Sequence, residues 1–142
     1  MRLGLAGCLA AAALAASGAV LAHHSFAMFD QARKLPLTGT VHDFQWTNPH
    51  AFIDLDVPNT AGGVDLWKVE LNSPNNLERQ GWHMHTLRPG YKVTVVINPL
   101  RDGAKGGLFV SVKLPNGRLI EDPTRKFRPG GPINVPEAQP GH

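Results

Sequence analysis

The order of five short alternating runs is the feature that most constrains how this chain can fold. Within each run, apolar residues recur at about every second position, which is typical of a strand that buries one face. The runs cover residues 35–46, 50–57, 64–71, 91–98 and 108–114. Between the third and fourth runs, Ser73 suits a helix N-cap, Pro74 the first helical position and Gly81 the helix exit. We therefore predict an all-β fold with one short helix.

Three strands, a short helix and two further strands follow the order of the OB-fold, a five-stranded Greek-key barrel. We predict a small five-stranded OB-like barrel; a barrel or sandwich of another topology is the alternative. In the first run the apolar phase slips between Val41 and Phe44, which predicts a β-bulge near Asp43. Gly39 would permit the sharp bend that a small barrel needs.

The core should combine the inward phase of the strands with a plug from the helix. Leu77 is the aliphatic residue of the helical segment, and Trp82 follows its exit, so both should pack into the core. In the fifth run the alternation directs four residues inward: Leu108, Val110, Val112 and Leu114. Residues 118–120, after the Pro-Asn-Gly turn, could pair as a short last strand.

Residues 1–22 are typical of a secretory signal, with Arg2 before an apolar run and small residues up to Ala22. Cleavage after Ala22 predicts a periplasmic or secreted protein with no membrane span. The alternative is lipidation of Cys8, although the apolar run before Cys8 is shorter than a usual signal. Residues 23–120 would then form the barrel domain. Residues 121–142 are rich in proline and glycine and predict a disordered tail.

Charge and cysteine content exclude several classes of partner and chemistry. Loss of Arg2 with the signal leaves 13 basic and 11 acidic residues. No basic stripe with interleaved aromatic residues accompanies this small excess, so we expect no nucleic-acid partner. Loss of Cys8, the one cysteine of the chain, excludes disulfides and thiolate chemistry in the mature protein.

The OB-like order predicts where a ligand would bind. In such barrels the loops between the first and second strands and between the fourth and fifth strands flank a common face. These loops are residues 46–50 and 99–107. Four of their residues are candidate ligand-binding residues: Trp46, Asn48, His50 and Arg101. Trp46 could stack a planar group there.

Histidines are the candidate metal ligands. Cleavage after Ala22 would make His23 the first residue, so that its α-amine and imidazole could chelate one Cu(II). His24 and His50 could complete this set, an arrangement called a histidine brace. Exposed histidines at a cleaved terminus, with His50 at a turn, are the alternative interpretation. His83 and His85 would lie on one side of an extended segment, but two ligands alone make a weak site.

Outward-facing carboxylates on the strands have a structural interpretation and a functional one. Asp54, Asp56 and Glu70 could form a cation-binding patch, but solvated strand faces normally have this composition. Glu70 could also pair with Arg79 across the junction of strand and helix.

Several short motifs together resemble a family of small secreted bacterial proteins of unknown function. The resemblance spans roughly residues 22–120 and rests on these motifs: His23-His24-Ser25-Phe26, Gly39-Thr40-Val41, Trp46-Thr47-Asn48-Pro49-His50, Trp67 with Glu70, Leu77 with Arg79, Gly81-Trp82 and Pro89-Gly90. It implies a small periplasmic β-barrel, and it includes His23, His24 and His50. His83, His85 and the tail fall outside these motifs.

Taken together, the sequence predicts a periplasmic, non-enzymatic binding module. Its partner would be a small ligand, a metal or another envelope protein, and copper is its one candidate cofactor. A copper-dependent redox enzyme with a histidine brace at His23 and a structural partner in an envelope complex are the alternatives.

Overall fold

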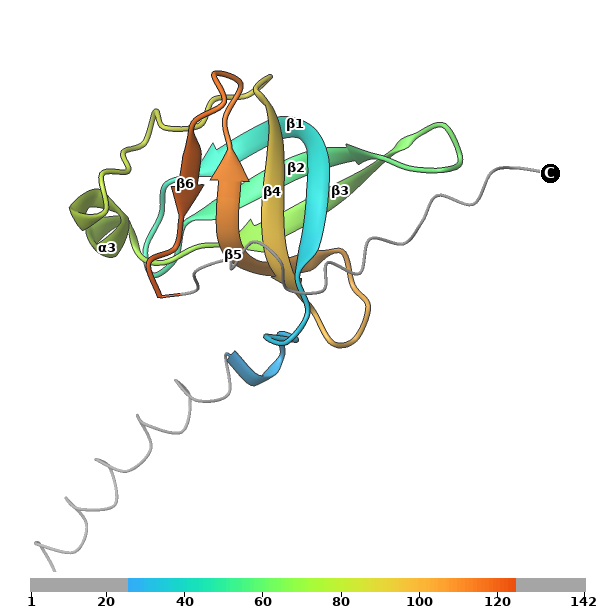
Figure 1. Cartoon of the computed structure of the whole chain (residues 1–142), viewed down its shortest axis with the longest axis horizontal. Helices are drawn as coiled ribbons and strands as arrows, with labels where there is room; N and C mark the ends of the chain where they lie inside the picture. Colours follow the sequence, from blue (N-terminus) through green and yellow to red (C-terminus); the bar gives the residue numbers. More distant parts are fainter. Residues whose placement is uncertain (1–25, 125–142) are drawn as a thin grey trace, which may run out of the picture.

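A closed barrel forms the body of the protein in the computed structural model, which describes residues 26–124 (Figure 1). The element order is β1 (Leu35–Gln45), β2 (Phe52–Pro58), β3 (Val64–Glu70), α3 (Pro74–Arg79), β4 (Lys92–Pro99), β5 (Gly106–Lys113) and β6 (Leu119–Glu121). Strands β1, β2 and β3 form an antiparallel meander, and β4 lies between β1 and β5. A parallel pairing of β3 with β5 closes the barrel, and β6 extends β5. This closure, with α3 between β3 and β4, confirms the predicted OB-like barrel.

Strand β1 is shared between the two halves of the barrel. Its first part, from Leu35 to Thr40, pairs with β4, and its second part, from Thr40 to Gln45, pairs with β2. The strand turns from one partner to the other at Gly39 and Thr40. A Cβ atom on Gly39 would lie 2.3 Å from the carbonyl oxygen of Asp56, so only glycine allows β2 to approach this closely. The register of β1 with β2 shifts between Val41 and Asp43, which confirms the predicted bulge.

The core is formed by inward residues of all six strands and by Leu77 and Trp82, which lie in and just after α3. Leu77 and Trp82 are both buried, as predicted, and the Trp82 ring meets the Phe109 ring edge-on at 5.4 Å. The Ser73 side chain makes no capping hydrogen bond, so packing rather than a cap holds this short helix.

The predicted alternation of β5 is wrong in its first half. Phe109 joins the core in place of Leu108 and Val110, which are buried outside the core cluster. The cause is a register shift of β4 against β5 between Val96 and Ile97, which reverses the phase. Both phases of β5 are buried, so alternation alone could not locate the slip.

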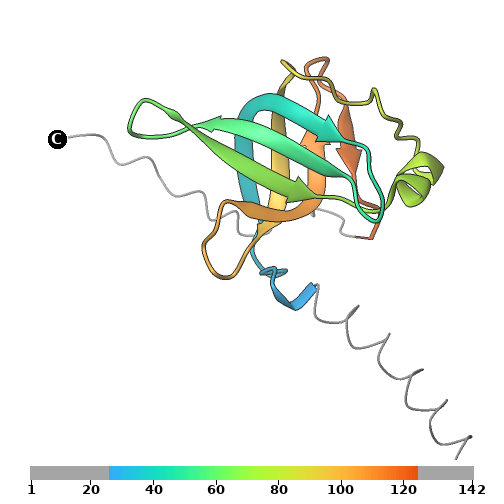
Figure 2. The same cartoon turned by 180° about the vertical axis from the view of Figure 1, so that it is seen from behind.

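The segment before β1 lies at one end of the barrel (Figures 1 and 2), and a buried amide attaches it there. The Asn98 side chain is fully buried, and its Nδ2 lies 2.7 Å from the carbonyl oxygen of Arg33 and 3.1 Å from that of Gln31. Its Oδ1 accepts a hydrogen bond from Lys34 Nζ. Phe29, buried in the same segment, forms a β-bridge with Leu100. Among residues 26–124, no helix is both long and apolar enough to cross a bilayer.

Candidate functional site

His50 and Glu70 form a close polar pair at the end of the barrel that the N-terminal segment contacts. His50 lies just before β2, and Glu70 ends β3, where its register partner is Phe52. The His50 Nδ1 atom lies 2.5 Å from Glu70 Oε1. A neutral imidazole in this pair carries its proton on Nδ1 and leaves the Nε2 lone pair for another partner. The His50 side chain is 37% exposed, so a ligand can approach it.

A small cavity of about 50 Å³ adjoins this pair. His50 and Glu70 line it together with Phe26, Leu71, Asn72 and Leu108. It has room for an ion with one or two waters, and it is far smaller than the clefts that hold organic ligands. Phe26 brings the start of the described chain directly beside His50.

The N-terminal segment also contacts the loop between β4 and β5. Arg101 Nε donates a hydrogen bond of 3.1 Å to the carbonyl oxygen of Ala27, and the Arg101 backbone N–H donates to Met28. Residues 26–30 therefore lie between the two loops that were predicted to flank an open binding face. The two hydrogen bonds from Arg101 hold residues 27 and 28 against this loop.

The other two predicted ligand-binding residues lie in the loop between β1 and β2. Trp46 is half-buried, and its ring packs edge-on against Phe44 at a centroid distance of 5.6 Å. This contact places Trp46 against the core. Asn48 is exposed in the same loop. Of the predicted metal ligands, His50 is placed by the structure, whereas His23 and His24 lie outside the described residues, as do the predicted signal and residues 125–142.

The outward carboxylates of the first three strands are each paired. Asp54 accepts from Lys68 at 2.9 Å and from Gln45 at 2.7 Å. Asp56 pairs with His42, and Glu70 pairs with His50 and not with Arg79 as the sequence suggested. The described part of the chain contains no group of three or more candidate metal ligands. These carboxylates therefore do not form a cation-binding patch of their own.

His42 should titrate at a higher pH than an ordinary histidine. Its hydrogen bond to Asp56, 3.0 Å long, and the charge of that carboxylate raise its pKa above 6.5. The pairing therefore contributes to stability below about pH 6.5, and this contribution is lost as the pH rises through the raised pKa. We expect an NMR titration of the His42 ring to show this elevation, and Asp56→Asn to lower the pKa towards 6.5. An unchanged titration in Asp56→Asn would contradict this assignment.

The sequence profile of DUF6152, a family of unknown function, matches residues 10–110. The chain belongs to the DUF6152 family. No protein of curated function matches the sequence. Among solved structures, a crystal structure of the mitochondrial single-stranded DNA-binding protein Rim1 from S. cerevisiae is similar, with 12% identity and a TM-score of 0.44 over 58% of this chain and 92% of that one. A selenomethionine-labelled Rim1 crystal has 10% identity and a TM-score of 0.40 over 58% and 93% of the two chains.

The DUF6152 match contains His50, Glu70 and Asn98. Glu70 was not predicted to be the partner of His50, because the pairing depends on the register of β2 against β3. The sequence contains one indication of the pairing. His50 and Glu70 each adjoin a strand end, and consecutive antiparallel strands bring such ends together.

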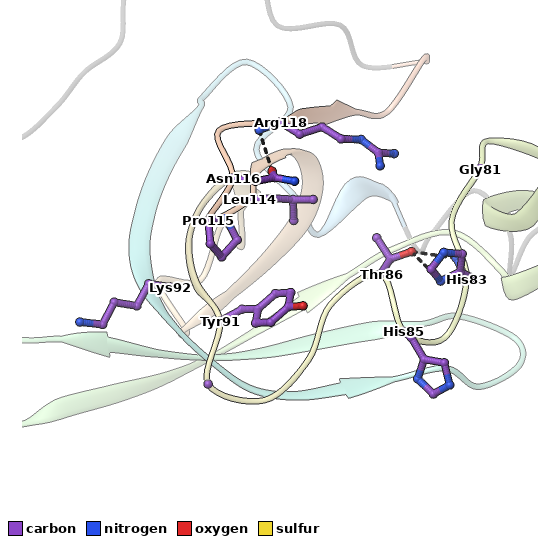
Figure 3. Close-up of a pocket in the computed structure, with 11 residues that line it drawn as sticks. Gly81, His83, His85, Thr86, Tyr91, Lys92, Leu114, Pro115, Asn116 and Arg118 are labelled. Carbon is purple, nitrogen blue, oxygen red and sulfur yellow. Dashed lines mark hydrogen bonds between the residues drawn. The ribbon is translucent and has the colours of Figure 1, made fainter.

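The second histidine pair of this DUF6152 protein does not form a chelating site. His83 and His85 lie around a turn instead of on an extended segment. His83 contacts Thr86, whereas His85 points away from both (Figure 3). Two imidazoles directed in this way do not face one ion.

Proposed function

We propose that this DUF6152 protein is a non-enzymatic binding module of the bacterial envelope that binds Cu(II) through His50, His23 and His24. The observation that supports the proposal most strongly is the His50–Glu70 pair beside Phe26. Metal-binding histidines commonly donate their second ring N–H to a carboxylate, which fixes the ring and makes the free nitrogen a better ligand. Imidazole and amine nitrogens are donors that suit copper.

The reach of the chain supports the same proposal. His24 and His23 precede Phe26 by two and three residues. An extended chain spans roughly 3.5 Å per residue, so both histidines are within about 10 Å of Phe26. Export with cleavage after Ala22 would also free the α-amine of His23.

The size of the cavity favours binding over redox catalysis on an organic molecule. About 50 Å³ beside His50 accommodates an ion and water, whereas organic ligands occupy clefts of roughly 300 Å³ or more. A structural partner in the envelope is the remaining alternative. Such a partner would be recovered by crosslinking whether or not copper is present.

Titration of the protein beginning at His23 with Cu(II), followed by electron paramagnetic resonance, tests this proposal. We expect a one-to-one complex with a nitrogen-rich signal. His50→Ala should weaken the complex at least tenfold, and Glu70→Gln should weaken it about tenfold by releasing the ring. One glycine added before His23 should change the signal, because the α-amine moves away from the ring.

His42→Ala is the matched control, since His42 also pairs with a carboxylate on the same sheet but lies away from Phe26. It should leave the affinity unchanged. Equal effects of His42→Ala and His50→Ala, or no effect of the added glycine, would refute the proposed ligand set.

A further inference from the structure

A much larger cavity, of about 640 Å³, lies at the end of the barrel away from the N-terminal segment. Its walls are the segment between α3 and β4, the start of β4, and the turn between β5 and β6 (Figure 3). This volume lies within the range of roughly 300–1,000 Å³ that is usual for small-molecule sites. His50 and Glu70, the described residues of the proposed copper site, do not line it.

The side chains around this cavity include two permanent cations and several neutral polar groups. Arg118 and Lys92 line it, and none of the described lining residues is an aspartate or a glutamate. Within residues 26–124, neither cation forms an ion pair with a carboxylate. Arg118 extends over the cavity towards His83, while Lys92 points outward (Figure 3). Of these two cations, Arg118 is therefore the one that can contact a ligand in the cavity.

Two further donors at the cavity have no acceptor in the described part of the chain. The Asn116 Oδ1 atom accepts the backbone N–H of Arg118 at 3.0 Å, which leaves the Asn116 amide N–H groups unused. The Tyr91 hydroxyl forms no hydrogen bond with a described residue and points towards Thr86 across the cavity. A site with unused donors and no carboxylate is complementary to an anion.

The floor of the cavity is apolar and rigid. Tyr91 and Leu114 are half-buried and pack against the core, and Pro115 continues this surface. The backbone of Tyr91 is fixed because its carbonyl oxygen accepts a hydrogen bond of 2.8 Å from Val41. An apolar group bound here would displace water from an apolar surface that need not rearrange.

We propose that this cavity binds a small organic carboxylate, with its charged group on Arg118 and its apolar or aromatic body on Tyr91 and Leu114. The guanidinium can form two parallel hydrogen bonds with a carboxylate, and Asn116 and Tyr91 supply further donors. The carboxylate of such a ligand would accept hydrogen bonds from the unused donors, and its apolar body would cover the apolar floor.

The first test compares phenylacetate with phenylacetamide, which has the same shape without the charge, by NMR titration of the ¹⁵N-labelled protein. We expect phenylacetate to shift the amides of Tyr91, Leu114 and Asn116 and to bind with a Kd of about 1 mM, as its size suggests. Phenylacetamide should bind at least fivefold more weakly. Equal affinities, or no shifts at these amides, would overturn the proposal.

Variants then separate the site from general surface charge. Arg118→Gln should weaken phenylacetate about tenfold, and Tyr91→Phe should weaken it to a smaller degree. Arg88→Gln removes the same charge from an exposed residue outside the cavity lining, and it should have no effect. If Arg88→Gln weakens binding as much as Arg118→Gln does, the attraction is to surface charge alone and the site is refuted.

Discussion

Replacing Asn98 by aspartate should lower the free energy of unfolding by about 3 kcal/mol, because a buried donor becomes a buried acceptor. The Asn98 amide faces the backbone carbonyl oxygens of Asp30, Gln31 and Arg33. A carboxylate of the same shape would repel these oxygens, and Lys34 would compensate for only part of the cost. Urea denaturation measures the change, and a lowering of Tm by roughly 10–20 °C should accompany it.

Asn116→Asp is the matched control for Asn98→Asp. Asn116 is exposed, and its Oδ1 acts as an acceptor for Arg118 N–H, a role that aspartate retains. We expect a change within about 0.5 kcal/mol. If both variants unfold at the same denaturant concentration as the unmodified protein, the Asn98 hydrogen bonds do not stabilise the N-terminal segment. The Asn98 variant should also weaken Cu(II) binding, because this segment carries Phe26 to His50.

Gly39→Ala should destabilise the protein by a similar amount, about 3 kcal/mol, through a backbone clash. The added Cβ would lie 2.3 Å from the Asp56 carbonyl oxygen and 3.1 Å from a Leu55 side-chain carbon. A side-chain rotation cannot relieve contact with a backbone atom. Strand β1 would have to move away from β2 at the position where it passes from one half of the barrel to the other.

Gly63→Ala is the control for this second substitution. A Cβ atom at Gly63 would meet only the Asn59 side chain, at 3.6 Å, which is an ordinary contact distance. We expect its stability to remain within about 0.5 kcal/mol of the original in the same denaturation experiment. Comparable losses at Gly39 and Gly63 would show that flexibility, and not the clash with Asp56, determines the effect.

Much of the fold could be predicted because its causes are local. Alternation located the strands, the slip after Val41 located the bulge, and Ser73, Pro74 and Gly81 marked the helix. Strand β5 was the exception, since burial of both its faces removes the contrast that alternation depends on. The inward position of Phe109 could be known only from the register of β4 against β5.

The candidate site was less predictable because it depends on contacts between distant segments. His50 was recognised from its place at a loop, but its partner Glu70 is fixed by the register of β2 and β3. Arg101 was predicted to bind a ligand, and its hydrogen bond to Ala27 joins two segments whose proximity the sequence does not reveal. The large cavity has no motif of its own, since its walls come from segments before β4 and after β5 that join only when the barrel closes.

The sharing of β1 between the two halves of the barrel has a thermodynamic consequence. The first part of β1 pairs with β4 and its second part with β2, so a displacement of this one strand disturbs both halves of the barrel. We therefore expect the two ends of the molecule to unfold as one cooperative unit. A ligand at either end stabilises that whole unit in proportion to RT ln(1 + [L]/Kd). Copper and a carboxylate would thus each raise the same melting transition, and their increments would add if the two sites do not otherwise communicate.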